Sequence, residues 1–151
     1  MTLETILNTP HPEKVRVLVV DDHPVMRECL CGMIELHSDI AVIGEASDGE
    51  EAVKLARQLI PEVILMDINM PKVSGIEATR VIHTELPHIR IIALSMSESD
   101  EFALEMIAAG ASEYHSKGGD MNRLLQAIRR KPDRVPCRCA PVDPIDLSST
   151  V

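Results

Sequence analysis

The stretch VRVLVVDDHP, residues 15–24, joins an apolar run to two adjacent carboxylates. Residues 15–20 are mostly β-branched and have the length and composition of a strand buried on both faces. Asp21 and Asp22 follow at once with no lysine or arginine beside them, so their charges repel each other. Pro24 stands where the first turn of a helix tolerates proline. The stretch therefore predicts a buried strand, an acidic turn and a helix.

The same alternation of apolar runs and helical patterns continues along the chain. Asp48, with Glu51 three residues later, has the spacing of a helix N-terminal capping box, and the segment 69–75 has loop composition. Val25 and Phe102 are among the apolar positions expected to face the sheet. Strict alternation of strands and helices predicts an α/β fold, in which helices cover both faces of a parallel sheet. The four further strands are expected at residues 40–46, 62–66, 89–95 and 111–116.

The two ends of the chain differ in composition from the segment between them. Residues 1–14 contain two prolines and are expected to form a short flexible N-terminal arm. Residues 132–151 contain four prolines and no periodic apolar face, so we expect a disordered tail that is too short to fold alone. Residues 15–131 then form a single domain, as the total length of 151 residues favours.

Composition and charge argue against several classes of function. The net charge is −9, so the chain lacks the basic surface that neutralises phosphates, and we expect no direct binding to nucleic acid. No stretch approaches the roughly 20 apolar residues of a membrane span. The N-terminus lacks a secretory signal, so a cytoplasmic location is expected. The four cysteines form two C-x-C pairs without a zinc-ligand spacing, which indicates ordinary thiols.

Acidic side chains end two of the predicted strands. Asp21 and Asp22 follow the first strand directly, and Asp67 follows the strand at 62–66. Parallel strands place their carboxyl ends at one edge of a sheet, so neighbouring strands would bring the three carboxylates into one pocket. Their repulsion requires a counterion, and hard oxygen ligands without a histidine or cysteine select Mg²⁺ or a similar cation. His23 borders the aspartates but is interpreted as a loop residue before the helix.

A hydroxyl and an amine end two further strands at the same predicted edge. Ser95 and Lys117 each stand at the end of a predicted strand. With a metal and a carboxylate they make a site suited to a phosphoryl group, because the amine offsets charge and the hydroxyl donates a hydrogen bond. A carboxylate is a competent nucleophile toward phosphorus and yields an acyl phosphate. Asp67, alone at its strand end, is the better nucleophile, whereas the adjacent pair of aspartates is better suited to holding the metal.

Four segments carry short motifs: VVDDHP at residues 19–24, LMDINMPKVSGIEATR at 65–80, IIALSMS at 91–97 and YHSKGG at 114–119. Each motif is weak by itself, but their order and spacing over residues 15–130 are specific. In this combination the chain resembles the receiver domain of response regulators in two-component signalling. The DDHP start and the LSM stretch resemble the NarL/FixJ-type transcriptional branch in particular.

The resemblance implies a doubly wound α/β fold of the flavodoxin-like type, with a five-stranded parallel sheet in the order 2-1-3-4-5. It also implies that Asp67 accepts the phosphoryl group. Asp22 and Asp67 would ligate Mg²⁺ through their side chains, Asp21 mainly through water, and Asn69 through its backbone carbonyl. By the same resemblance the chain is a regulatory domain rather than an enzyme, apart from accepting its own phosphoryl group and slowly losing it.

Three further residues match the switching positions of that family. Ser95 matches the switch hydroxyl, Tyr114 the switch aromatic and Lys117 the invariant amine. Movement of Ser95 toward a phosphoryl group would vacate space for Tyr114 and change the face used in protein interactions. Two residues depart from the family pattern: Gly118 stands where proline is usual after the lysine, and Met96 is larger than the small residue often found after the switch hydroxyl.

The resemblance also implies partners. The phosphoryl donor is a sensor histidine kinase, and a homodimer formed on phosphorylation is left open. In the NarL/FixJ branch a helix-turn-helix output domain follows the receiver, yet none follows Arg130 here. Control of transcription and contact with DNA would therefore pass through an output domain that this sequence does not contain.

Three other functions are compatible with parts of the pattern. A phosphorylation-independent adaptor with the receiver fold would not need the acidic cluster or Lys117. A phosphatase with an aspartyl-phosphate intermediate typically has a second aspartate two residues after the nucleophile, where this chain has Asn69. An FMN-binding flavodoxin shares the expected topology, but the chain lacks a Ser/Thr-rich loop after the first strand and aromatics to sandwich a flavin. We therefore expect a phosphorylation-controlled signalling switch.

Overall fold

The computed structural model describes residues 14–68, 70, 74–96 and 100–130. The expected N-terminal arm, except for Lys14, and the expected tail at 132–151 lie outside the described residues. Asn69, the expected carbonyl ligand of the metal, also lies outside them. The expectations for these segments, and the bounds of the single domain at 15–131, therefore stay predictions.

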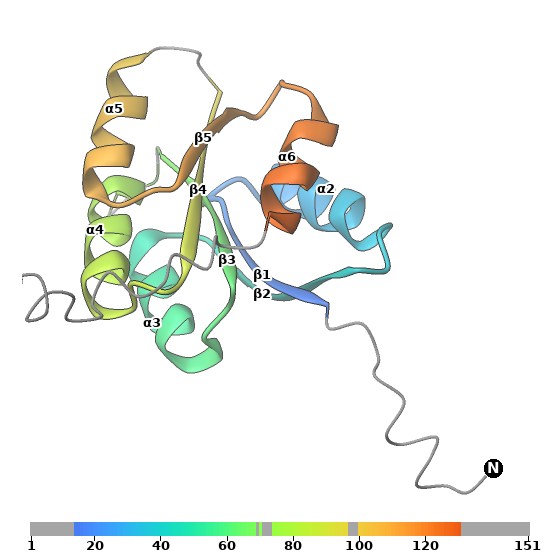
Figure 1. Ribbon diagram of the computed structural model, residues 1–151, viewed down its shortest axis with the longest axis horizontal. Coiled ribbons are helices and arrows are strands. Elements are labelled where there is room, and N and C mark those ends of the chain that lie inside the picture. The colour runs from blue at the N-terminus through green and yellow to red at the C-terminus, as the bar shows by residue number, and fades with distance from the viewer. Residues whose placement is uncertain (1–13, 69, 71–73, 97–99, 131–151) are drawn as a thin grey trace, which may run out of the picture.

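Five strands form one sheet in the order β2-β1-β3-β4-β5 (Figure 1). All neighbouring strands are parallel. The order confirms the predicted doubly wound sheet of the flavodoxin-like type. The strand order reverses beside β1, which places the carboxyl ends of β1 and β3 next to each other, where such folds bind their ligands. The strands are β1 (Val15–Val20), β2 (Ile40–Ala46), β3 (Val63–Asp67), β4 (Arg90–Ser95) and β5 (Glu113–Ser116).

Helices cover both faces of the sheet (Figure 1). α2 and α6 lie on one face, and α3, α4 and α5 lie on the other. This arrangement follows from the alternation of the sequence, because each parallel strand pair needs a crossover that is long enough to return the chain. None of the described helices is long and apolar enough to cross a membrane. The helices are α2 (Pro24–Glu35), α3 (Gly49–Leu59), α4 (Gly75–Glu85), α5 (Asp100–Ala109) and α6 (Met121–Arg129).

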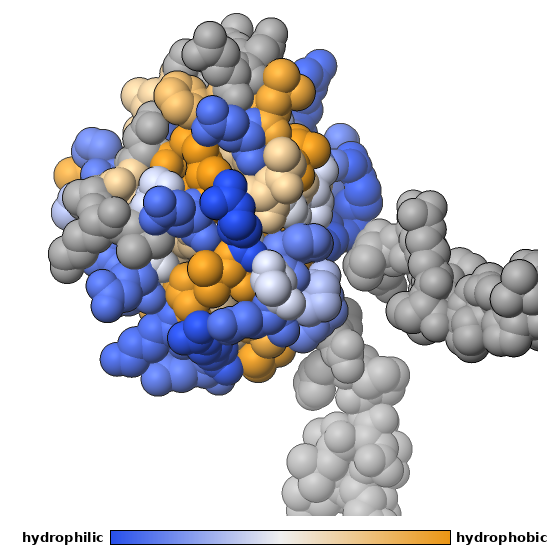
Figure 2. All heavy atoms as spheres, turned by 90° about the vertical axis from the view of Figure 1, so that its left-hand side faces the viewer, coloured by the Kyte–Doolittle hydropathy of each residue, from blue (hydrophilic) through white to orange (hydrophobic). Residues whose placement is uncertain are grey.

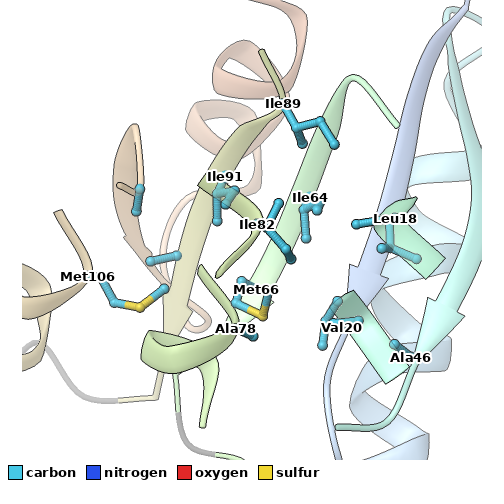
Figure 3. Close-up of a cluster of buried hydrophobic side chains, with 14 of the residues drawn as sticks. Leu18, Val20, Ala46, Ile64, Met66, Ala78, Ile82, Ile89, Ile91 and Met106 are labelled. Atoms are coloured by element: carbon cyan, nitrogen blue, oxygen red, sulfur yellow. The ribbon is translucent and has the colours of Figure 1, made fainter. Parts of the chain in front are cut away.

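Two aliphatic clusters, one on each face of the sheet, form the core. Successive residues of a strand point to opposite faces, so β1 contributes Val17 and Val19 to the cluster under α2 and α6. Leu18 and Val20 belong to the cluster under α3, α4 and α5, which is drawn in Figure 3. Full burial of each such side chain stabilises the fold by about 1.5–3 kcal/mol. The nearly aromatic-free composition is thus sufficient for a closely packed core.

The start and end of α3 illustrate how local sequence sets the helix bounds. The Asp48 carboxylate accepts a hydrogen bond from the Glu51 amide at 2.8 Å, which confirms the predicted cap. The Glu51 carboxylate accepts from the amide and hydroxyl of Ser47, each at 3.0 Å, rather than from the cap residue itself. At the other end Ile60 adopts a left-handed conformation with φ 46°, directly before Pro61. The helix therefore ends at Leu59, two residues before the proline.

Two apolar residues that were expected to face the sheet are exposed instead. Val25 is 75% exposed, because it lies in the first turn of α2. Phe102 is 38% exposed, and α5 also exposes Leu104 and Ile107. This helix is apolar on most sides, so one buried face cannot accommodate all of its large residues. Figure 2 views the molecule from the side of α4 and α5 and shows apolar atoms at the surface there among polar ones.

Candidate functional site

Three carboxylates meet where β1 and β3 end. Asp67 is the last residue of β3, while Asp21 and Asp22 come directly after β1. The two strands pair in register up to Val20 and Met66, so their next residues lie side by side. Each of the three aspartates, and His23, offers a ligand atom within 4.8 Å of those of the others. The structure thus brings together the acidic residues that the sequence placed at one sheet edge.

Lys117 supplies the positive charge of this cluster. Its Nζ lies 2.7 Å from Asp21 Oδ2 and 3.2 Å from Asp67 Oδ2, and only 2% of its side chain is exposed. The backbone fixes the lysine in turn, because the Lys117 amide donates to the Ser95 carbonyl oxygen at 2.8 Å where β4 ends. A buried ammonium between two carboxylates is a strong electrostatic contact, and it reduces the repulsion between them.

Asp21 and Asp22 are placed differently within the cluster. Asp21 is fully buried, and its Oδ1 accepts from the His23 amide at 2.9 Å while its Oδ2 faces Lys117. Asp22 Oδ1 is buried but accepts no hydrogen bond from any described residue. His23 Nδ1 lies 2.9 Å from this oxygen, a distance suited to an ion pair when the imidazole is protonated, but the pair does not have hydrogen-bond geometry. Asp22 therefore has an oxygen available for another ligand.

The residues of the cluster fit a hard divalent cation such as Mg²⁺. Buried polar atoms normally have a partner, and an unpartnered carboxylate oxygen beside two further carboxylates is well suited to bind a metal ion. Asp21 Oδ1 already accepts a hydrogen bond from the His23 amide, whereas Asp22 Oδ1 accepts none from the described residues. Asp22 is accordingly well placed for direct coordination and Asp21 for support, and direct coordination by Asp67 stays a prediction.

The Asp67 carboxyl has a perturbed acidity. Its pKa is raised from 3.8 to about 6: burial is the largest cause, Asp21 and Asp22 also raise the pKa, and Lys117 lowers it. The net increase means that one ammonium does not fully compensate the buried negative charge. A cation bound in the cluster would favour the ionised carboxylate, which is the nucleophilic form.

The raised pKa of Asp67 predicts that Asp67→Asn stabilises the protein at neutral pH in the absence of divalent metal. The folded state holds the Asp67 proton up to about pH 6, whereas the unfolded chain releases it near 3.8, so ionisation of this group destabilises the fold as the pH rises between these values. We expect a gain of about 2 kcal/mol in the free energy of unfolding near neutral pH, shrinking as the pH falls through 6. Urea unfolding in EDTA across this range measures it.

Asp39 provides a control of opposite sign. Its pKa is lowered by a hydrogen bond from Arg129, so its ionised form supports the fold above its usual titration range. Asp39→Asn should therefore weaken the protein at neutral pH and have less effect at acidic pH. A loss of stability for Asp67→Asn at neutral pH, parallel to that of the control, would show that the Asp67 charge does not destabilise the fold.

Ser95 and Tyr114 lie on β4 and β5, the two strands that follow β3 in the sheet. Ser95 ends β4 and is 1% exposed, one residue beyond the paired Asp67 and Leu94. Tyr114 lies in β5 opposite Ala93 and packs, half-buried, against the core cluster under α3, α4 and α5. Ser95 therefore lies at the sheet edge predicted for it, while the switching roles of Ser95 and Tyr114 stay predictions.

Arg27 is a contributor to this region that sequence reasoning missed. Its Nη1 donates to the Asp21 carbonyl oxygen at 2.7 Å, so the acidic turn is anchored to the first turns of α2. His23, interpreted as a loop residue, is the residue before α2 and contacts both adjacent aspartates. The only sequence signal for the contact between Arg27 and the Asp21 carbonyl oxygen was a basic residue about one helical turn after the DDHP segment. The peptide bond between Lys117 and Gly118 is trans, like all those described.

Comparison with known proteins places this geometry in a family. The sequence pattern of the response regulator receiver domain matches residues 17–129. Response regulator GacA of Pseudomonas viridiflava is 42% identical over 115 residues, which cover 76% of this chain and 54% of that protein. Transcriptional regulatory protein LiaR of Bacillus subtilis (strain 168) is 45% identical over 115 residues, with the same 76% and 54% covered. The chain thus spans about half the length of these two relatives.

Solved structures lead to the same family. A two-component response regulator of the LuxR family from Aurantimonas sp. SI85-9A1 shares the fold with a TM-score of 0.73 at 40% identity, over 77% of this chain and 83% of that one. Sequence motifs, strand order and the acidic cluster all agree with this likeness. The chain belongs to the response regulator receiver domain family, and its relatives are LuxR- and NarL/FixJ-type response regulators.

Proposed function

We propose that this receiver domain is a phosphorylation-controlled switch that takes its phosphoryl group on Asp67 from a sensor histidine kinase. The observation that carries the proposal is the convergence of three carboxylates and the buried ammonium of Lys117 at the carboxyl edge of the sheet. A structural role alone does not explain this convergence, because it concentrates repelling charges and leaves Asp22 Oδ1 without a hydrogen bond from the described residues.

The proposed reaction needs little acid–base chemistry from this chain. An oxygen of the Asp67 carboxylate attacks phosphorus, the P–N bond to the donor imidazole breaks, and an acyl phosphate and a free histidine result. Mg²⁺, held by Asp22 and Asp67 with support from Asp21 and Asn69, would supply positive charge to the phosphoryl oxygens. Lys117 lies 3.2 Å from Asp67 Oδ2 and offsets the charge that gathers there.

The proposed switch lies between the site and the exposed face of α5. In the phosphorylated state the Ser95 hydroxyl donates to a phosphoryl oxygen, and Tyr114 turns into the space that this movement vacates. A population shift of this kind takes several kcal/mol of differential contact, so Lys117 and loop rearrangement contribute as well. The proposed changes alter the exposed apolar surface of α5, which contacts β5 and includes Leu104 and Ile107.

The proposed output is transcription control through a further domain. Relatives such as LiaR are transcriptional regulators and are nearly twice as long as the matched region, since it covers 54% of their length. The net charge of −9 makes this chain unsuited to bind DNA directly. The proposed location is the cytoplasm, and a homodimer formed on phosphorylation stays a prediction.

The function is tested by exposing the protein to acetyl phosphate and measuring its intact mass. We expect one added phosphoryl group with Mg²⁺, none with EDTA, and none for Asp67→Asn even with Mg²⁺. Asp39→Asn, which changes an exposed aspartate outside the cluster, should label like the unmodified chain. An unlabelled chain that binds no Mg²⁺ would instead favour the phosphorylation-independent adaptor.

A further inference from the structure

One guanidinium joins the acidic turn to two other elements of the fold. Arg27 of α2 donates from Nη1 to the Asp21 carbonyl oxygen at 2.7 Å, and its Nε lies 3.2 Å from Glu45 Oε1 in β2. Only 20% of the Arg27 side chain is exposed, so solvent screens these contacts only in part. The turn that carries the metal-binding aspartates is therefore tied to α2 and, through Glu45, to β2.

An irregularity in the β1–β2 pairing makes this contact possible. The register shifts by one residue so that Ile43 is skipped. Before the shift, Val42 belongs to the cluster under α2 and α6, but after it Ala46 belongs to the cluster on the opposite face. Without the shift, Glu45 would alternate onto the face away from α2. The extra residue thus directs Glu45 toward Arg27.

Glu45 is also approached by a second residue of α2. Burial, together with the nearby Glu45 carboxylate, raises the pKa of Cys31 to about 12. The thiol therefore stays protonated near the carboxylate. Positions 27 and 31 are one helical turn apart, so both side chains lie on the side of α2 that is near Glu45.

The contact with Arg27 completes the set of partners of Asp21. The Asp21 amide donates to the Ala46 carbonyl oxygen at 3.0 Å, and its carboxylate accepts from the His23 amide and Lys117. The Asp21 carbonyl oxygen accepts a hydrogen bond from Arg27. Asp21 itself is 0% exposed. Oδ1 of the next residue, Asp22, accepts no hydrogen bond from the described residues. The position of the Asp22 carboxylate therefore depends on how firmly the main chain of Asp21 is held.

We propose that Arg27, oriented by Glu45, is a positioning residue for the metal site, and that it fixes the β1–α2 turn so that the Asp22 carboxylate faces Asp67. The inference rests on the proposed function, because it concerns the same site. Arg27 touches neither the metal nor the phosphoryl group in this role. It acts through the main chain of Asp21.

A purely electrostatic role and a positioning role of Arg27 predict opposite effects of its removal on the affinity for Mg²⁺. A guanidinium near an acidic cluster repels a divalent cation, so its loss would tighten Mg²⁺ binding if only long-range electrostatics mattered. A positioning role predicts weaker binding, because the turn loses its anchor. Arg27→Met removes both charge and donors, whereas Arg27→Lys keeps the charge but cannot reproduce the paired guanidinium donors.

The test is a calorimetric titration of the full chain with Mg²⁺ alone, without phosphodonor, beside urea unfolding in EDTA. We expect the dissociation constant of Arg27→Met to rise about tenfold, as for other residues that orient metal ligands, and that of Arg27→Lys to rise less. Arg16→Met is the matched control, because Arg16 donates to the carbonyl oxygens of Leu59 and Ile60 away from the site. It should lose stability but keep its affinity for Mg²⁺.

The outcomes separate this inference from the proposed function. Unchanged or tighter Mg²⁺ binding by Arg27→Met, or an equal loss of affinity in Arg16→Met, would overturn the positioning role while the unmodified chain still binds metal and labels. Failure of the unmodified chain to bind Mg²⁺ would overturn the function itself. If Arg27→Met does not fold, Arg27→Lys decides the matter, since an affinity equal to that of the unmodified chain at unaltered charge contradicts positioning.

Discussion

Lys117→Met is expected to lower the free energy of unfolding by about 3 kcal/mol in metal-free buffer, because breaking a buried ion pair leaves uncompensated charge. The lost ammonium lies 2.7 Å from Asp21 Oδ2 and 3.2 Å from Asp67 Oδ2, and 2% of the side chain is exposed. Protonation of Asp67, whose pKa is already about 6, limits the loss. Urea unfolding in EDTA near neutral pH measures the effect.

Divalent metal should reduce the cost of losing Lys117. A bound cation replaces part of the missing positive charge, so millimolar Mg²⁺ should stabilise Lys117→Met more than it stabilises the unmodified chain. Lys54→Met, at an exposed position of α3, is the control and should change stability little under either condition. Equal losses for the two variants would show that the ammonium of Lys117 does not hold the cluster together.

Gly75→Ala is expected to destabilise the protein by about 3 kcal/mol, the upper end of the cost of overpacking a rigid site. Gly75 begins α4, and an added Cβ would overlap the Asp67 carbonyl oxygen and lie 2.9 Å from the carbonyl carbon. Both atoms belong to the backbone, so they cannot move aside as a flexible side chain would. The substitution should also displace Asp67 and reduce labelling by acetyl phosphate.

Gly32→Ala is the matched control for this substitution. Gly32 lies inside α2 with no heavy atom near the position of an added Cβ, so alanine should raise stability by about 0.5–1 kcal/mol through its higher helix propensity. Chemical denaturation of the two variants gives changes of opposite sign if the steric reasoning is correct. Similar changes would mean that Gly75 has no special close approach to β3.

The sequence was sufficient to predict the strand order and the meeting of the acidic residues. Short β-branched runs that alternate with helical patterns have few compact solutions, and parallel strands of one sheet share an edge at their carboxyl ends. The sequence alone places Asp21 and Asp67 together, because Asp21 directly follows one such run and Asp67 ends another. Ser95 and Lys117 reached the same edge for the same reason.

Contacts that depend on register or on local packing could not be predicted. The Arg27–Glu45 pair exists because the β1–β2 pairing skips Ile43, and nothing in the local sequence signals that shift. The exposure of Val25, in the first turn of α2, and of Phe102, on a helix with more large apolar residues than one face can bury, likewise could not be predicted. Helical spacing gives the apolar face of a helix but not the length over which a neighbour covers it.

The central claim, that Asp67 is the residue that carries the phosphoryl group, is tested most directly by reductive trapping. The chain is labelled with acetyl phosphate and Mg²⁺, treated with borohydride, which converts an acyl phosphate to an alcohol, and mapped by peptide mass spectrometry. We expect the reduced residue at position 67 and at no other aspartate. Reduction at Asp21 or Asp22, or a stable label with no reduced aspartate, would contradict the claim.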